Sequence, residues 1–204
     1  MRAEWRVKDI ALTKHLDLVR IGLIGPRGHE WVVGAIGAKG LKSPDEAIKA
    51  CIEVGSKHGV HLIALNPDAV AGFTHIAFAA EHAVRAWDEG RRAARYLELE
   101  LQLYLVGTRE IREAVAVCRP RGEEVVLVVL GKSREKAVRA LEELMTRLGL
   151  SRDDKLLELT PKRALRVAET LGIPTDVLEA ANKGDLISAV VALASNRAVL
   201  LSLS

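Results

Sequence analysis

One stretch of the chain, residues 123–131 (EEVVLVVLG), constrains the fold more than any other. Four valines and two leucines follow one another in it without a polar interruption. β-Branched residues favour strands, and a continuous apolar run is typical of a strand buried on both faces. We therefore expect this segment to lie at the centre of a sheet.

Three more strands are predicted on its N-terminal side, after an N-terminal extension of about residues 1–15. They are 18–25 (LVRIGLIG), 30–37 (EWVVGAIG) and 60–65 (VHLIAL). The segment PRGH between the first two contains Pro26 and Gly28, which suit the turn of a hairpin. The turn pair Asn66-Pro67 closes the third strand.

Helices are predicted where capping residues precede amphipathic segments. Ser43, Pro44 and Glu46 form the start signal of a helix that ends before Gly59. The other predicted helices are a long zone over about 70–117, a helix capped by Ser133, one opened by Thr160-Pro161, a short one capped by Thr175, and a final one from Asp185 onward. The predicted fold class is mixed α/β: a small, largely antiparallel sheet with an N-terminal hairpin, packed with several α-helices in a single domain over 1–204.

Residues 95–106 (RYLELELQLYLV) fit two structures. As a strand, alternate leucines would share one face, whereas as a helix they form two stripes, with Glu98 and Gln102 together on an exposed edge. Leu, Glu and Gln are good helix formers, and no β-branched residue occurs before Val106. We predict a helix here, followed by a second helix that starts at the cap Thr108.

Composition bounds the class of protein. The formal net charge is only +3, and 19 arginines stand against 11 lysines, so charge alone does not require a nucleic-acid partner. One glutamine and three asparagines are present, a scarcity of heat-labile residues that suggests a heat-adapted organism. Cys51 and Cys118 are expected to be buried thiols rather than a disulfide.

The two ends of the chain indicate a soluble, cytoplasmic protein. The N-terminus (MRAEWRVKDI) carries charges where a signal peptide needs an apolar core. The apolar C-terminal stretch 186–204 is interrupted by Asn196 and Arg197, so we expect it to be too short to span a bilayer. No membrane partner is expected.

Motifs for catalysis or cofactor binding are missing. The glycine-rich segment 22–40 matches neither phosphate-loop pattern, so its glycines are expected to serve turns and close backbone contacts. Four histidines lack a zinc-type spacing and are expected to be structural or surface residues with satisfied hydrogen bonds: His58, His61, His75 and His82. Many carboxylates have a basic residue at helical spacing, as in Glu81–Arg85, Asp88–Arg92 and Arg109–Glu113. We predict no enzyme activity, no metal and no cofactor.

Two surfaces remain as candidates for binding. The first is an arginine-rich segment, which consists of Arg85, Arg91, Arg92, Arg95, Arg109, Arg112, Arg119 and Arg121. The same window, 85–121, carries six acidic residues, so the local excess of positive charge is small. The second is the apolar C-terminal helix, which either belongs to the core or docks on a partner protein.

The span from residue 65 to 131 resembles a known family. It contains an Asn-containing turn, a helix with HIAFAA, then LELEL and GTREIREA, and finally a hydrophobic strand. In this order and spacing it is similar to the kinase-binding accessory subunit of the KEOPS (EKC) tRNA-modification complex, the PRPK-binding protein family, notably its archaeal type. The positions of the family motif are occupied by His75, Glu100, Gly107, Arg109, Ile111, Glu113 and Ala114. The N-terminal extension and segment 151–184 are longer than is typical of the family.

The resemblance implies a non-catalytic role. Members bind and support the atypical kinase/ATPase of KEOPS, which makes threonylcarbamoyladenosine next to the anticodon of tRNA, and a different subunit performs the carbamoyl transfer. Members are also implicated in holding the 3′ CCA tail, a single strand that needs cations and flat side chains. The candidate tRNA-binding residues are His82, Arg85, Arg92, Arg95 and Arg109. The candidate kinase-binding residues are Leu193, Val199, Leu200 and Leu201.

Arg109 has two possible roles. It either ties two helices together, which we favour, or contacts RNA directly. Two other functions also stay open for the chain as a whole. It can be a small-molecule-binding enzyme or sensor that uses the glycine-rich N-terminal hairpin with His58 and His61, or a purely structural partner that does not contact RNA.

Overall fold

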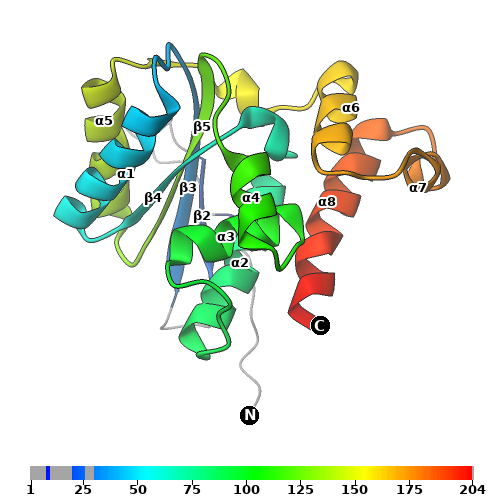
Figure 1. Cartoon of the computed structure of the whole chain (residues 1–204), viewed down its shortest axis with the longest axis horizontal. Helices are drawn as coiled ribbons and strands as arrows, with labels where there is room; N and C mark the ends of the chain where they lie inside the picture. Colours follow the sequence, from blue (N-terminus) through cyan, green and yellow to red (C-terminus); the bar gives the residue numbers. More distant parts are fainter. Residues whose placement is uncertain (1–7, 10–19, 26–29, 204) are drawn as a thin grey trace.

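The computed structural model describes residues 8–9, 20–25 and 30–203 (Figure 1). The strands are β1 (Lys8–Asp9), β2 (Arg20–Ile24), β3 (Trp31–Lys39), β4 (His61–Leu65), β5 (Glu124–Gly131) and β6 (Ser151–Arg152). The α-helices are α1 (Pro44–His58), α2 (Phe73–Asp88), α3 (Leu97–Val106), α4 (Ile111–Cys118), α5 (Arg134–Leu148), α6 (Pro161–Thr170), α7 (Thr175–Ala181) and α8 (Leu186–Leu203). Two short 3-10 helices are η1 (Pro67–Ala69) and η2 (Asp154–Leu157).

The strands form an antiparallel sheet in the order β1-β2-β3-β5-β4, and β6 pairs with the end of β3. The prediction of a mixed α/β fold with a largely antiparallel sheet is confirmed, and so is the pairing of the N-terminal strands. The turn predicted between them, 26–29, lies outside the described residues. β5 has β3 on one side and β4 on the other, as its apolar sequence predicted.

Side chains alternate along β5 and therefore enter two different cores. Val126, Val128 and Leu130 pack with α2 and α3, whereas Val125, Leu127 and Val129 pack with α1 and α5. Figure 1 shows α1 and α5 on one side of the sheet, and α2, α3 and α4 on the other. This three-layer arrangement explains why residues 125–130 of β5 are all apolar, on both faces of the strand.

A third core lies beside the sheet and joins the C-terminal helices. It contains buried residues of α6, α7 and α8, together with Ala71 ahead of α2. α8 packs against α2, α3, α6 and α7, so it connects this cluster to the helices that cover the sheet. Because α8 packs against helices of both groups, the third core and the sheet with its covering helices belong to one domain.

By length and composition alone, α8 is the one described helix that is apolar enough to cross a membrane. It continues unbroken through Asn196 and Arg197, so the prediction that these residues make the stretch too short is wrong. A mostly buried core helix of a soluble protein passes the same test, whereas 28% of α8 is buried, through small residues such as Ala189 and Ala194.

Side-chain caps begin several helices at the predicted residues. The Oγ of Ser43 accepts a hydrogen bond from the backbone N of Glu46, and Ser133 and Thr160 cap α5 and α6 in the same way. Two predicted starts are wrong. The cap position of α7 is Pro174 rather than Thr175, and α4 begins two residues later than Thr108 implied.

The helical interpretation of residues 95–106 is confirmed, because α3 covers Leu97–Val106. Its predicted exposed edge is wrong. Glu98 and Gln102 are half-buried, and the carboxylate of Glu98 bonds to Nδ1 of His61 at 2.9 Å. The helix lies between α2, α4, α8 and the end of β4, so few of its positions reach solvent.

The strand glycines allow close backbone contacts, as predicted. A Cβ on Gly37 would overlap the backbone of Asp153, whose N–H donates to the Gly37 carbonyl at 2.8 Å. A Cβ on Gly131 would press on the side chain of Val60. Close packing therefore explains these two glycines, and no bound ligand is needed to explain them.

Candidate functional site

The arginine-rich segment contains an exposed loop, residues 89–96, between α2 and α3. We call it the arginine loop; it carries Arg91, Arg92 and Arg95, all exposed. The buried carboxylate of Glu100, 2% exposed, accepts hydrogen bonds from the backbone N–H groups of Ala93 (3.0 Å) and Ala94 (2.7 Å). A buried anion on α3 therefore holds the backbone that presents these arginines.

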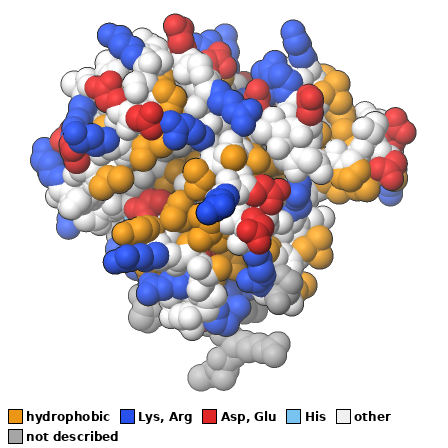
Figure 2. Space-filling model, viewed as in Figure 1, with side chains coloured by type: hydrophobic (Ala, Val, Ile, Leu, Met, Phe, Trp, Pro, Cys, Tyr) orange, Lys and Arg blue, Asp and Glu red, His pale blue; other side chains and the backbone are white. Residues whose placement is uncertain are grey.

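Two aromatic rings accompany these arginines. The guanidinium of Arg92 lies 4.2 Å from the ring centre of Trp87, and that of Arg95 lies 5.6 Å from Tyr96, which is 54% exposed. Figure 2 shows Lys and Arg side chains along the lower part of this face, where Figure 1 places the end of α2 and the following loop. Flat cations next to aromatic faces suit the phosphates and bases of a single strand.

The other predicted tRNA-binding residues of α2 lie deeper. His82 is buried and stacks on Tyr104, with ring centres 5.9 Å apart. Arg85 is half-buried and bonds to Glu81 at 2.9 Å. Burial and the nearby charge of Arg85 lower the pKa of His82 to about 4. Both residues are therefore less accessible than the three exposed arginines of the arginine loop.

The four predicted structural histidines differ in their contacts. His58 bonds to Glu143 and His61 to Glu98, at 2.8 and 2.9 Å, so both have partners as expected. Nδ1 of His82 is buried and has no hydrogen-bond partner among the described residues, so the expectation of a satisfied ring is wrong for this atom. The described residues contain no cluster of His, Cys, Asp or Glu that could hold a metal ion.

His75, the first residue of the family motif, joins three segments. It is fully buried; its Nδ1 accepts from the N–H of Ala71, and its Nε2 lies 3.1 Å from the carbonyl of Leu105. These partners assign the proton to Nε2. The ring therefore links the entry to α2 with the end of α3.

The middle of the motif connects α3 and α4 to α8. Gly107 ends α3 in the left-handed region (φ 73°), and a Cβ there would lie 2.5 Å from the Cβ of Arg197. Nη2 of Arg109 donates to the carbonyl of Leu201 at 3.2 Å. The predicted helix tie is thus present, and it joins the α3–α4 connection to the C-terminal helix.

The remaining motif residues lie at the start of α4. Ile111 is its first residue and is 39% exposed, whereas Ala114 is buried. The carboxylate of Glu113 accepts from the hydroxyl of Thr108 at 2.6 Å rather than pairing with Arg109. Likewise Asp88, expected beside Arg92, accepts from Nε1 of Trp31. Of the three predicted helical ion pairs, Glu81–Arg85 forms among the described residues.

The candidate kinase-binding residues on α8 are unequally accessible. Leu193 and Leu201 are half-buried against neighbouring cores, and Val199 is also half-buried. Leu200 is 65% exposed. The sequence prediction missed Leu203, which is 79% exposed one turn further along the helix. Leu200 and Leu203 therefore form the accessible apolar end of α8.

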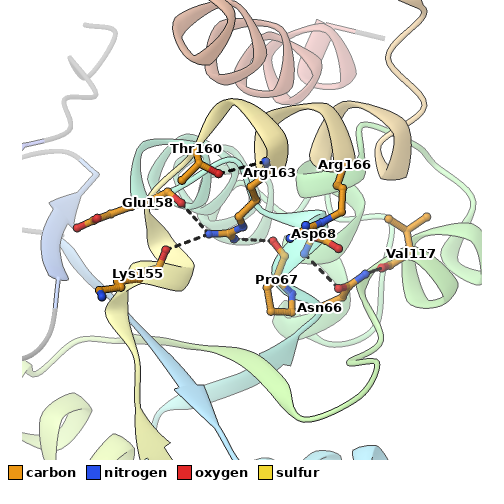
Figure 3. Close-up of polar contacts among 9 residues, drawn as sticks. All are labelled: Asn66, Pro67, Asp68, Val117, Lys155, Glu158, Thr160, Arg163 and Arg166. Atoms are coloured by element: carbon orange, nitrogen blue, oxygen red, sulfur yellow. Dashed lines mark hydrogen bonds and ion pairs between the residues drawn. The ribbon is translucent and has the colours of Figure 1, made fainter.

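A buried arginine was also missed. Arg163 on α6 is 6% exposed, and its guanidinium donates to the carbonyls of Pro67 (2.8 Å), Glu158 (2.9 Å) and Lys155 (3.3 Å). Figure 3 shows the side chain directed into this ring of carbonyls between α6, η1 and η2. Burial lowers its pKa. Its spacing four residues before the buried Val167 was the available sequence signal.

The same junction holds the start of η1. Asn66 accepts from the N–H of Asp68 and donates to the carbonyl of Val117, while Asp68 bonds to Arg166 at 3.3 Å (Figure 3). Arg163 and Asn66 together fix the segment between β4 and α2. That segment positions the start of the helix that leads to the arginine loop.

Comparison with models of protein families finds no match, and a search of curated proteins also finds none.

Proposed function

We propose that the chain is a non-catalytic accessory subunit of a KEOPS complex, which binds the atypical kinase/ATPase and helps to capture the 3′ CCA tail of tRNA. Through the kinase it would act indirectly on the carbamoyl-transferase subunit. The observation that carries the tRNA part is the arginine loop, which presents Arg92 and Arg95 beside aromatic rings on a backbone held by Glu100. Single-stranded RNA is recognised by this combination of cations and flat groups.

Reversing both charges in the double variant Arg92→Glu, Arg95→Glu is expected to weaken binding of intact tRNA by roughly tenfold or more. Log affinity falls as log salt rises, with a slope of about −0.7 for each phosphate contact on a single strand, so the loss of two contacts should make the slope less negative by about 1.4. The measurement is fluorescence anisotropy with intact tRNA and with tRNA that lacks its CCA end, over a salt series.

Arg139→Glu, compared with Arg92→Glu alone, is the control for one reversed charge, because Arg139 is an exposed arginine on α5, on the opposite side of the sheet. It should leave the tRNA affinity within about twofold. The tRNA part of the proposal fails if the wild-type protein binds both tRNAs equally, or if the control variant loses as much affinity as the double variant.

The kinase part rests on the accessible end of α8. The double variant Leu200→Glu, Leu203→Glu is expected to weaken binding of the KEOPS kinase by roughly tenfold or more, because charges would replace an apolar docking surface. Both side chains are largely exposed, so the fold should be retained. Calorimetric titration with the purified kinase gives the affinity, and circular dichroism confirms the fold.

Leu165→Glu provides the corresponding control. Leu165 is 54% exposed on α6, outside the proposed docking surface, so its substitution should not change kinase affinity. Unchanged affinity in the α8 variant would remove this end of the helix from the kinase interface. It would leave the tRNA part of the proposal untouched.

A further inference from the structure

A further cation lies close to the arginine loop, directly after β5. Trp31 is the first residue of β3, and the next residue of that strand pairs with Gly131, the last residue of β5. The ring of Trp31 therefore lies next to Lys132, whose Nζ is 4.1 Å from the ring centre. Lys132 is exposed, and the cation–π contact restricts an ammonium group that is otherwise mobile.

The ring of Trp31 connects this lysine to the start of the arginine loop. Its Nε1 donates to the carboxylate of Asp88 at 3.1 Å, and Asp88 is the last residue of α2. The preceding residue, Trp87, has the guanidinium of Arg92 at 4.2 Å from its ring centre. One hydrogen bond therefore separates two pairs that each consist of a cation and an aromatic ring.

A second connection leads to the end of the loop. The ring centres of Trp31 and His61 are 6.1 Å apart, and Nδ1 of His61 bonds to Glu98 at 2.9 Å. Glu98 lies two residues after Tyr96, the last residue of the arginine loop. Figure 1 shows the start of β3 and the end of α2 at the same lower end of the molecule. Trp31 is therefore linked to both ends of the loop.

We propose that Lys132 binds a phosphate of the same single-stranded RNA that the arginine loop holds, so that the RNA-binding surface extends from the loop across the start of β3 and the end of β5. This inference rests on the proposed capture of tRNA. A lysine ammonium is a compact cation with three N–H donors, which suits a phosphate oxygen. Cations that alternate with aromatic rings suit a nucleic-acid strand, which carries both phosphates and bases.

The electrostatic environment of Lys132 favours an additional anion. Burial lowers the pKa of this residue, and the nearby charge of Asp88 opposes that shift. A partly desolvated cation gains more from an anion than a cation in bulk water does, because the effective dielectric constant is lower. Three carboxylates at this end of the molecule already have hydrogen-bond partners: Asp88 with Trp31, Glu89 with Arg91, and Glu98 with His61.

Two RNA oligonucleotides test the extension, the tetranucleotide ACCA and a decanucleotide with the same 3′ end. Lys132→Met should weaken binding of the decanucleotide by about fivefold at 0.1 M salt, because one phosphate contact has a slope of about −0.7 and the range from 0.1 to 1 M is tenfold. The slope of log affinity against log salt should become less negative by about 0.7. ACCA should bind to the variant and to the wild type equally, and Lys132→Arg should bind both oligonucleotides like the wild type.

Lys49→Met is the matched control, because Lys49 is an exposed lysine on α1, on the other side of the sheet. Its affinity for the decanucleotide should stay within about twofold of the wild type. Labelling of amines followed by mass spectrometry locates the contact. The bound decanucleotide should protect Lys132 from the reagent and leave Lys49 reactive.

Three results would overturn the inference. The first is wild-type affinity of Lys132→Met for the decanucleotide while the double variant Arg92→Glu, Arg95→Glu loses affinity, which would leave the proposed function in place. The second is an equal loss for ACCA and the decanucleotide, because Lys132 would then act through the structure of the loop. The third is no binding of either oligonucleotide to the wild type. The comparison of intact tRNA with tRNA that lacks its CCA end decides separately whether the proposed function fails.

Discussion

Arg163→Met is expected to lower the free energy of unfolding by about 3–5 kcal/mol. The substitution removes a buried guanidinium that donates to the carbonyls of Pro67, Glu158 and Lys155. Hydrogen bonds to a charged group contribute about 1.5–3 kcal/mol each, and carbonyls left buried without a partner add a desolvation cost. Part of this loss is offset, because the variant no longer has to bury a charged group. Urea unfolding followed by circular dichroism measures the change.

Arg166→Met is the matched control on the same helix. Arg166 forms a partly exposed ion pair with Asp68, a class of contact that contributes about 0–1 kcal/mol. The decrease in the free energy of unfolding should therefore be several-fold smaller for Arg166→Met than for Arg163→Met. Equal losses in the two variants would mean that the ring of carbonyls does not stabilise the junction of α6, η1 and η2.

The stability of the wild-type protein is expected to fall by about 3 kcal/mol between pH 6.5 and pH 4 because of His75. Burial lowers the pKa of this residue to about 4, and a second proton would face the N–H of Ala71. The unfolded chain binds this proton near pH 6.5 and the folded chain does not. Stability is therefore fully present above pH 6.5 and decreases as the pH falls toward 4.

Urea unfolding at several pH values tests this expectation, with His75→Gln as the variant that lacks the titrating ring. The variant should be less stable than the wild type at pH 7 and should show a shallower decline below pH 6.5. His82, whose pKa is also lowered to about 4, should supply part of the remaining slope. A wild-type stability that stays constant from pH 7 to pH 4.5 would contradict the assignment.

The candidate site was predictable only in part. Arg92 and Arg95 are exposed as the sequence suggested, because charged residues after a helix end usually remain in water. The burial of His82 and the half-burial of Arg85 were not predictable, because helical spacing does not show which side of α2 meets Tyr104. Glu100 as the carboxylate that holds the arginine loop required the three-dimensional arrangement of α3 and the loop.

Local and periodic signals in the sequence determined most of the elements. The valine run produced the inner strand β5, and Ser43, Ser133 and Thr160 began helices where their side chains reach backbone N–H groups three residues ahead. Such interactions depend on neighbours within a few residues, so they can be read from the chain directly.

Tertiary structure alone decided which side chains became buried and which strand edge has no neighbouring strand. Glu98 became half-buried because β4 begins beside it, and Arg163 became buried because Pro67, distant in sequence, lies against it. The open edge of β4 exists because strand order, rather than strand sequence, leaves one side without a neighbour. Contacts between distant segments depend on how whole elements pack, and the pattern of a single element does not contain that information.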